Sequence, residues 1–305
     1  MKIAVLSDCL RPTNDQGCHG LGRSACELAE GFVERGHTVS LYGGFGSTFE
    51  HGDCYQHTEE DSRAHILSSQ HEFADVVLDC SHFHTYSTLS NSLPTINSIR
   101  DLEYGRRHSC SANTKNAVVS TDYMVKWVSR FDIKAKKVHT GLRLDKYEIG
   151  VKNRKGYVFM CGGQERKGHS IVEKGRRITH DSRIKLYADL PFDQYLEILR
   201  KAEFMLLPSN YLDAAPRMAL EAAAVGTPTL CLNEGGTPCH VAHGLTGWIC
   251  KDVEEFYSVL PTLSVLTKEF EPVKMREWVD REHNYHNMIS SYLELLELVA
   301  GGETW

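Results

Sequence analysis

The sequence predicts an α/β protein built from two doubly wound, Rossmann-like domains, each with a parallel sheet. Short apolar strands alternate with amphipathic helices in the first half, a polar turn-forming segment follows, and the alternation then restarts. The length of 305 residues also fits two domains. Two such domains facing one another would form a cleft, where ligands bind at the carboxyl ends of the strands.

The N-terminal half begins with a strand, a loop rich in Gly, Asn and Asp, a helix and a second strand, which together predict a right-handed parallel crossover. The helix has an apolar stripe at helical spacing, formed by Ala25, Leu28, Ala29, Phe32 and Val33. Gly36 ends this helix. We expect strands at residues 2–6, 38–42, 74–78, 95–99 and 117–120.

The polar segment at residues 152–156 predicts a domain boundary near residue 150. After it we expect strands at residues 157–160, 204–207 and 229–232. Helices are expected at residues 193–201 and from about Pro216. The stretch 278–299 predicts one long helix, so the expected domains are 1–150 and 151–275, followed by a C-terminal helix in 276–305.

Composition excludes several classes of protein. No apolar run is long enough to span a bilayer or to form a signal peptide, and the ten cysteines contain no Cys-x-x-Cys pair, so we expect a cytoplasmic chain with reduced thiols. Sixteen histidines show no familiar ligand spacing, so no metal site is expected. The net charge of −6 disfavours DNA as a partner. Residues 134–155, with eight Lys or Arg against two acids, are either an anion-binding face or a solvated one.

The most informative segment runs from residue 207 to residue 228. Asp213 lies in the loop after an expected strand, Pro216 occupies the expected first helical position, and Glu221 follows the first acid after eight residues. The amide groups of a helix's first turn and the helix dipole attract a phosphate, so residues 214–218 form a candidate diphosphate site. Glu221 is placed to accept hydrogen bonds from hydroxyls, although acids near a helix start also occur for dipole reasons alone.

This segment, Asp213-Ala-Ala-Pro-Arg-Met-Ala-Leu-Glu221-Ala with Gly226-Thr-Pro228 downstream, resembles the E-x7-E motif of retaining GT-B glycosyltransferases of family GT4, the glycosyl transferases group 1. The resemblance implies the GT-B fold, with a C-terminal helix that crosses back to the N-terminal domain. It also implies that Asp213 contacts the hydroxyls of the donor sugar and Glu221 the ribose. Asp213 replaces the usual Glu and is one methylene shorter.

Other landmarks follow in the same order. Cys161-Gly-Gly163-Gln-Glu-Arg166-Lys167-Gly168 resembles the family's G-R-x4-K-G, whose Arg and Lys hold the diphosphate. Lys167 matches, whereas Gly163 stands at the Arg position and Arg166 is a possible substitute. The glycine loop before the first helix and the segments 35–39 and 233–248 are also similar to family motifs. The implied donor-binding residues are Gly20, Gly163, Arg166, Lys167, Asp213, Ala215, Pro216, Arg217, Met218 and Glu221.

The acceptor side departs from the family pattern. Arg100 stands where the family has a histidine at the end of the fourth strand, and an arginine offers a hydrogen-bond donor but accepts no proton. The family's other histidine is displaced to His82 or His84, which are acceptor-side candidates together with Asp101 or have a structural role. The implied catalytic residues are Asp213, Lys167 and Arg100.

The resemblance implies retaining transfer of a sugar from a nucleotide diphosphate donor, a UDP-sugar by default, to a hydroxyl acceptor, without metal or other cofactor. Two alternatives stay open. One is a glycosyltransferase that acts on a modified base in DNA, suggested by the compact length and the basic stretch. The other is a sugar-nucleotide-binding protein without turnover, suggested by the departures at Asp213, Gly163 and Arg100. The sequence identifies neither the acceptor nor the oligomeric state.

Overall fold

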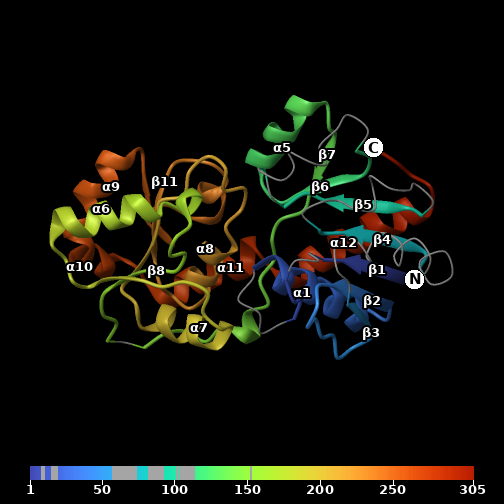
Figure 1. Ribbon diagram of the computed structural model, residues 1–305, viewed down its shortest axis with the longest axis horizontal. Coiled ribbons are helices and arrows are strands. Elements are labelled where there is room, and N and C mark those ends of the chain that lie inside the picture. The colour runs from blue at the N-terminus through green and yellow to red at the C-terminus, as the bar shows by residue number, and fades with distance from the viewer. Residues whose placement is uncertain are drawn as a thin grey trace. The chain divides into compact units, whose positions relative to one another are not determined.

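The structure is a computed structural model that describes residues 1–7, 11–14, 20–56, 74–81, 93–100, 102, 114–151 and 153–305. These residues form two compact units (Figure 1). One contains Met1–His139 and His286–Trp305, and the other contains Thr140–Tyr285. Each unit is a parallel sheet with helices, which confirms the predicted fold class.

The first unit holds a seven-stranded sheet in the order β3-β2-β1-β4-β5-β6-β7. Its strands are β1 (Lys2–Leu6), β2 (Thr38–Gly43), β3 (Asp53–Gln56), β4 (Val76–Asp79), β5 (Thr95–Ser98), β6 (Ala117–Val119) and β7 (Ala135–Lys137). Every neighbouring pair is parallel, and Leu6 of β1 lies opposite Tyr42 of β2. The helices are α1 (Gly20–Glu34), α5 (Asp122–Val128) and α12 (Tyr285–Ala300).

The second unit holds a five-stranded parallel sheet in the order β12-β11-β10-β8-β9. Its strands are β8 (Tyr157–Phe159), β9 (Ile184–Leu186), β10 (Phe204–Leu207), β11 (Thr229–Leu232) and β12 (Gly247–Cys250). Its α-helices are α6 (His169–Thr179), α7 (Phe192–Lys201), α8 (Arg217–Ala224), α9 (Val253–Val259), α10 (Leu263–Leu266) and α11 (Pro272–Glu282). Every residue of β10 and β11 is buried, as expected for central parallel strands covered on both faces.

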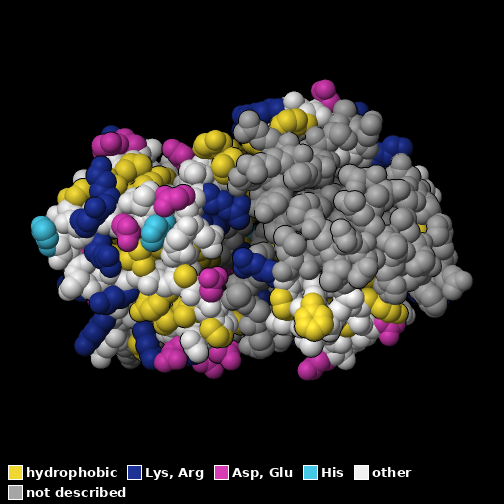
Figure 2. All heavy atoms as spheres, viewed as in Figure 1, with side chains coloured by type: hydrophobic (Ala, Val, Ile, Leu, Met, Phe, Trp, Pro, Cys, Tyr) yellow, Lys and Arg dark blue, Asp and Glu magenta, His cyan; other side chains and the backbone are white. Residues whose placement is uncertain are grey.

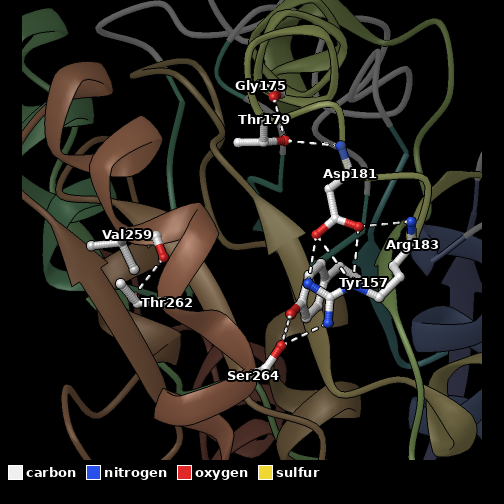
Figure 3. A network of polar contacts seen from close by, with 8 residues as sticks. All are labelled: Tyr157, Gly175, Thr179, Asp181, Arg183, Val259, Thr262 and Ser264. Carbon is white, nitrogen blue, oxygen red and sulfur yellow. Dashed lines mark hydrogen bonds and ion pairs between the residues drawn. The ribbon is translucent and has the colours of Figure 1, made fainter.

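A polar network joins β8, β9 and α10 at one edge of this sheet (Figure 3). The Arg183 guanidinium donates to both carboxylate oxygens of Asp181 and, over 2.7 Å, to the Ser264 hydroxyl. The Tyr157 and Ser264 hydroxyls are also 2.7 Å apart. The hydrogen bond from Arg183 holds the pKa of Asp181 below its usual value. The network therefore fastens the edge strand to the neighbouring helix.

The single long helix expected at residues 278–299 is wrong, because α11 ends at Glu282 and α12 begins at Tyr285. Between them His283 is buried, with its Nδ1 2.9 Å from the carbonyl oxygen of Thr140. Its own carbonyl accepts from the amide of Leu142 over 2.9 Å. The carbonyl of His283, which would accept the next hydrogen bond of a continuing helix, is thus bound by the backbone of a distant segment. Neither Gly nor Pro marks this break in the sequence.

The limits of the compact units differ from the expected limits at residues 150 and 275. Residues 140–150 belong to the second unit, where the buried Tyr147 ring lies 6.0 Å from the Phe192 ring. Arg276 of α11 donates to the carbonyl oxygens of Leu144 and Ala224, which joins α11 to the same unit. Of the expected C-terminal segment 276–305, only the part from His286 belongs to the first unit.

The basic stretch at residues 134–155 is divided between the two units. Its bases before Thr140 belong to the first unit and the others to the second. Lys137 pairs with Asp122 at 2.6 Å, Arg143 pairs with Asp145 at 3.3 Å, and Arg154 binds backbone carbonyl groups. On the face of the second unit seen in Figure 2, basic and acidic side chains are interspersed. Within the described ranges, no helix is long and apolar enough to cross a membrane.

Candidate functional site

Three loops of the second unit meet at the carboxyl edge of its sheet. They follow β8, β10 and β11, three strands that are neighbours in the sheet, and comprise residues 160–168, 208–216 and 233–240 (Figure 1). All three contain segments that the sequence analysis singled out, and the third contains the Gly235-Gly236 pair. This edge is where open α/β sheets bind ligands.

Backbone contacts fix these loops against one another. The amide of Asn210 donates to the carbonyl of Arg166 over 2.9 Å, and the amide of Gly236 donates to the carbonyl of Asp213 over 2.7 Å. A Cβ atom on Gly236 would lie 1.5 Å from the carbonyl oxygen of Ala214. At Gly168, where φ is +90°, it would lie 2.3 Å from the carbonyl oxygen of Pro208. Only glycine allows these close approaches, so the loops hold their side chains in defined places.

Lys167 and Asp213, which are far apart in the sequence, form an ion pair at the centre of this edge. Lys167 Nζ lies 2.8 Å from both carboxylate oxygens of Asp213. The two side chains are only 12% and 6% exposed, respectively. Lys167 ends the one-turn 3-10 helix Glu165–Lys167, and Asp213 lies in the loop between β10 and α8. The structure therefore brings together the cation and the acid that the sequence assigned to a diphosphate and a sugar.

Glu221 lies within α8 and is 1% exposed. Its Oε1 atom accepts from Arg217 Nε over 3.0 Å and from the Tyr147 hydroxyl over 3.2 Å. Arg217 Nη2 also lies 3.3 Å from that hydroxyl oxygen. The second acid of the motif is thus held by a buried base one helical turn away and by a tyrosine from a distant segment.

Helix α8 begins at Arg217, one residue after Pro216, whereas Pro216 was expected as the first helical residue. The carbonyl of Pro216 accepts from the amide of Ala219 over 3.1 Å and lies 3.2 Å from Nδ1 of the buried His240. The proline has no side-chain capping group, so the first-turn amides of α8 are not capped by it. The N-terminus of α8 follows directly from the loop that carries Asp213.

Two arginines bind the opposite end of α8. Arg154 donates to the carbonyls of Val225 and Gly226, and Arg276 donates to that of Ala224. Burial lowers the pKa of Arg154 to about 10, so its guanidinium is still charged at neutral pH. Cations at the C-terminal carbonyls complement the helix dipole, and both arginines therefore fix the helix that carries Glu221.

Cys161 lies at the end of β8, with its Sγ 3.5 Å from Met218 Sδ. Burial raises the pKa of this thiol to about 11, against the opposite effect of Lys167. The thiol is therefore protonated at neutral pH and is a poor nucleophile. Its contact fits β8 against the first turn of α8.

The remaining candidates for donor binding surround this edge or lie in the other unit. Gly163 is exposed with φ +79°, and a Cβ atom there would meet nothing within 4 Å. Arg166 lies in the same turn as Lys167, and Ala215 lies between Asp213 and Arg217 in the loop before α8. Gly20 begins α1 in the first unit. Within the described ranges, no group of three or more His, Cys, Asp or Glu side chains is placed to hold a metal ion.

Arg100, in the first unit, follows β5 and links three elements. Its guanidinium donates to the hydroxyls of Ser24 in α1 over 2.5 Å, Ser98 in β5 over 3.0 Å and Tyr292 in α12 over 3.3 Å. The other acceptor-side candidates, His82, His84 and Asp101, lie outside the described residues.

Sequence reasoning missed four residues that position this site, namely Tyr147, Arg154, His240 and Arg276. Tyr147, Arg154 and Arg276 lie outside the recognised motifs, whereas His240 lies within the segment 233–248 that resembles a family motif. No local spacing marks any of the four as a positioning residue. A buried acid such as Glu221 requires polar partners, but the sequence does not show which segments supply them.

The family described as Glycosyl transferases group 1 has a model that matches residues 156–258. The amylovoran biosynthesis glycosyltransferase AmsK of Erwinia amylovora is 29% identical over 126 residues, which cover 38% of this chain and 31% of AmsK. The aligned segment thus spans less than a third of that relative's length.

Solved structures match over nearly the whole chain. The glycosyltransferase AviGT4, involved in avilamycin A biosynthesis, is 18% identical, with a TM-score of 0.73 over 100% of this chain and 99% of AviGT4. Anabaena HepE, in complex with UDP and glucose, is 12% identical, with a TM-score of 0.76 over 97% of this chain and 99% of HepE. The chain therefore has the GT-B fold, and its residues 156–258 are similar to the glycosyl transferases group 1 family.

Proposed function

We propose that this protein is a retaining glycosyltransferase that moves a sugar from a nucleoside diphosphate donor to a hydroxyl acceptor without metal or other cofactor. The observation that carries the proposal is the meeting of Lys167 with Asp213 beside the N-terminus of α8, at the carboxyl edge of the sheet. A UDP-sugar is the preferred donor, because the similar HepE structure contains UDP and glucose.

Each part of the donor has a matching group. The first-turn amides of α8, with Lys167 and Arg166, attract the diphosphate; Glu221 accepts from the ribose hydroxyls; and Asp213 accepts from the sugar hydroxyls. Negative charge grows on the leaving diphosphate as the bond to the sugar carbon breaks. Lys167 and the positive end of α8 stabilise that charge in a largely buried setting.

Retention follows in this proposal from attack on the face that the diphosphate leaves. The acceptor hydroxyl forms the new bond to the sugar carbon, and its proton passes to the departing diphosphate oxygen. No enzymic nucleophile is required, in agreement with the protonated state of Cys161, the thiol at the end of β8. Arg100 as an acceptor-side residue, the acceptor itself and a cytoplasmic location stay predictions.

A thermal-shift panel tests the donor. UDP, GDP, ADP, TDP and their sugar conjugates are added at millimolar concentration, and a ligand that binds the native state raises the melting temperature by mass action. We expect uracil nucleotides to give the largest shift. No shift with any nucleotide would contradict the proposal, and a shift without release of nucleoside diphosphate in the presence of acceptors would indicate a binding protein without turnover.

Two further measurements test the chemistry. NMR of the product reports the anomeric configuration, and inversion would contradict the proposed retention. Transfer measured with and without a chelating agent reports the role of a divalent metal, and we expect the same rate in both.

A further inference from the structure

The pairing of Lys167 with Asp213 has a consequence for how the donor is recognised, which rests on the proposed function. The lysine Nζ lies 2.8 Å from both oxygens of the acid assigned to the sugar. The cation proposed for the diphosphate is therefore already occupied. A diphosphate that binds Lys167 must weaken this ion pair.

Weakening the pair leaves the buried carboxylate of Asp213 without full compensation of its charge. Its side chain is only 6% exposed, so water compensates its charge poorly, and the arriving diphosphate adds negative charge nearby. Breaking a buried ion pair from one side is costly because the other charge then has no partner. Hydroxyl groups of a sugar attached to the diphosphate are donors that can replace the ammonium at Asp213.

Backbone contacts hold the loop that carries Asp213 and oppose its movement away from Lys167. The backbone amide of Asp213 donates to the carbonyl of Asn210 over 3.0 Å, and its carbonyl accepts from Gly236 over 2.7 Å. Gly236 also approaches the Ala214 carbonyl so closely that a Cβ atom would lie 1.5 Å from it. Side-chain rearrangement leaves these backbone contacts intact, and in it the lysine and the acid exchange partners together.

We propose that the Lys167–Asp213 ion pair couples recognition of the two halves of the donor, so that the site favours a sugar diphosphate over a bare diphosphate. The diphosphate draws Lys167 from the pair, and the sugar hydroxyls take its place at Asp213. Binding of each half thus assists the other, and the released nucleoside diphosphate is held weakly after transfer. Coupling of this kind between two sites is commonly about 5- to 150-fold in affinity.

Calorimetric titration with inorganic pyrophosphate tests the ion pair independently of the nucleotide base. Asp213→Asn frees Lys167, so we expect pyrophosphate to bind this variant about 5- to 150-fold more tightly than the wild type. Glu165→Gln is the matched control, because it removes one negative charge from the exposed side of the same turn. We expect its affinity to stay close to the wild-type value.

The double variant Lys167→Met/Asp213→Asn separates ion-pair release from simple loss of repulsion. The gain of Asp213→Asn should disappear in the Lys167→Met background, whereas a gain due only to repulsion would persist. An Asp213→Asn variant that binds pyrophosphate no more tightly than the wild type, or a gain that persists without Lys167, would overturn the proposal. Melting curves confirm that each variant is folded.

Titration with UDP and UDP-glucose then measures the coupling itself. We expect the wild type to bind UDP-glucose more tightly than UDP, and Asp213→Asn to abolish or reverse that preference. If the wild type binds neither uracil ligand, the proposed donor is wrong. The pyrophosphate titrations still test the ion-pair proposal in that case. Equal preference in the wild type and in Asp213→Asn would contradict the coupling.

Discussion

The buried cluster around Glu221 predicts that Glu221→Ala weakens the fold of the second unit as well as nucleotide binding. Glu221 and Arg217 are 1% and 8% exposed, and the Nε to Oε1 distance is 3.0 Å. Removal of the acid leaves a buried guanidinium without its carboxylate, which costs about 3–5 kcal/mol. At roughly 2–4 °C per kcal/mol for a domain of about 150 residues, the melting temperature should fall by roughly 6–20 °C.

Differential scanning calorimetry measures this effect, and two variants make it specific. Glu197→Ala removes an acid that also pairs with a base four residues away, Lys201, but with both side chains exposed, so its melting temperature should stay near the wild-type value. Arg217→Met/Glu221→Ala removes both buried charges and should recover much of the lost stability. A Glu221→Ala protein that melts within about 2 °C of the wild type would refute the reasoning.

The structure supports three further predictions. Arg100→Met should lower the melting temperature, because the guanidinium contacts the Tyr292 hydroxyl and two serines. A loss of transfer activity with an unchanged melting temperature would show instead that Arg100 acts in catalysis. Burial raises the pKa of the Cys161 thiol in the folded protein from 9.0 to about 11, so the stability that the neutral thiol contributes is complete below pH 9 and is lost as the pH rises through 11. Alkylation followed by peptide mapping should show Cys161 protected at neutral pH, and rapid labelling at that pH would contradict this prediction. Gly236→Ala should abolish nucleotide binding or folding, because the new Cβ atom would clash with the Ala214 carbonyl. In Gly163→Ala the new Cβ atom meets no atom within 4 Å, so the positive φ should lower the free energy of unfolding by only about 1–2 kcal/mol. Thermal melts and nucleotide titrations measure both effects.

The strands that the sequence failed to predict are the edges of the two sheets. β3 and β7 bound the first sheet, and β9 and β12 bound the second. An edge strand pairs on one side only and is partly exposed, so β3, β7 and β9 do not form the apolar run that marks a buried strand. β7, for example, reads Ala-Lys-Lys and contains no fully buried residue. β12, which reads Gly-Trp-Ile-Cys, is apolar but was missed as well. Central strands such as β10, buried throughout, were predicted at their observed positions.

In the site, too, features set by neighbouring residues could be predicted from the sequence, whereas contacts between distant segments could not. The spacing of Asp213 and Glu221 is visible in the chain, and it predicted a loop followed by a helix, which the structure contains. The partners of these acids are not visible in the same way. Tyr147 reaches Glu221 from a segment before β8, and Lys167 reaches Asp213 from the loop after β8. Lys167 was recognised through its own motif, whereas Tyr147 lies in no motif and was missed.

The charges of this edge explain why its ion pairs matter for binding an anion. Lys167, Arg166 and Arg217 are balanced by Asp213, Glu221 and Glu165, so these six side chains contribute no net positive charge. In the proposed function a diphosphate is therefore not attracted by an excess of cations, and its binding depends on directed donors such as the first-turn amides of α8 and on exchange of partners within the pairs. Because Asp213 and Glu221 are buried, that exchange is favourable only when new donors reach them. A balanced site of this kind selects a ligand that brings both an anion and hydroxyl groups, which is the chemistry of a sugar nucleotide.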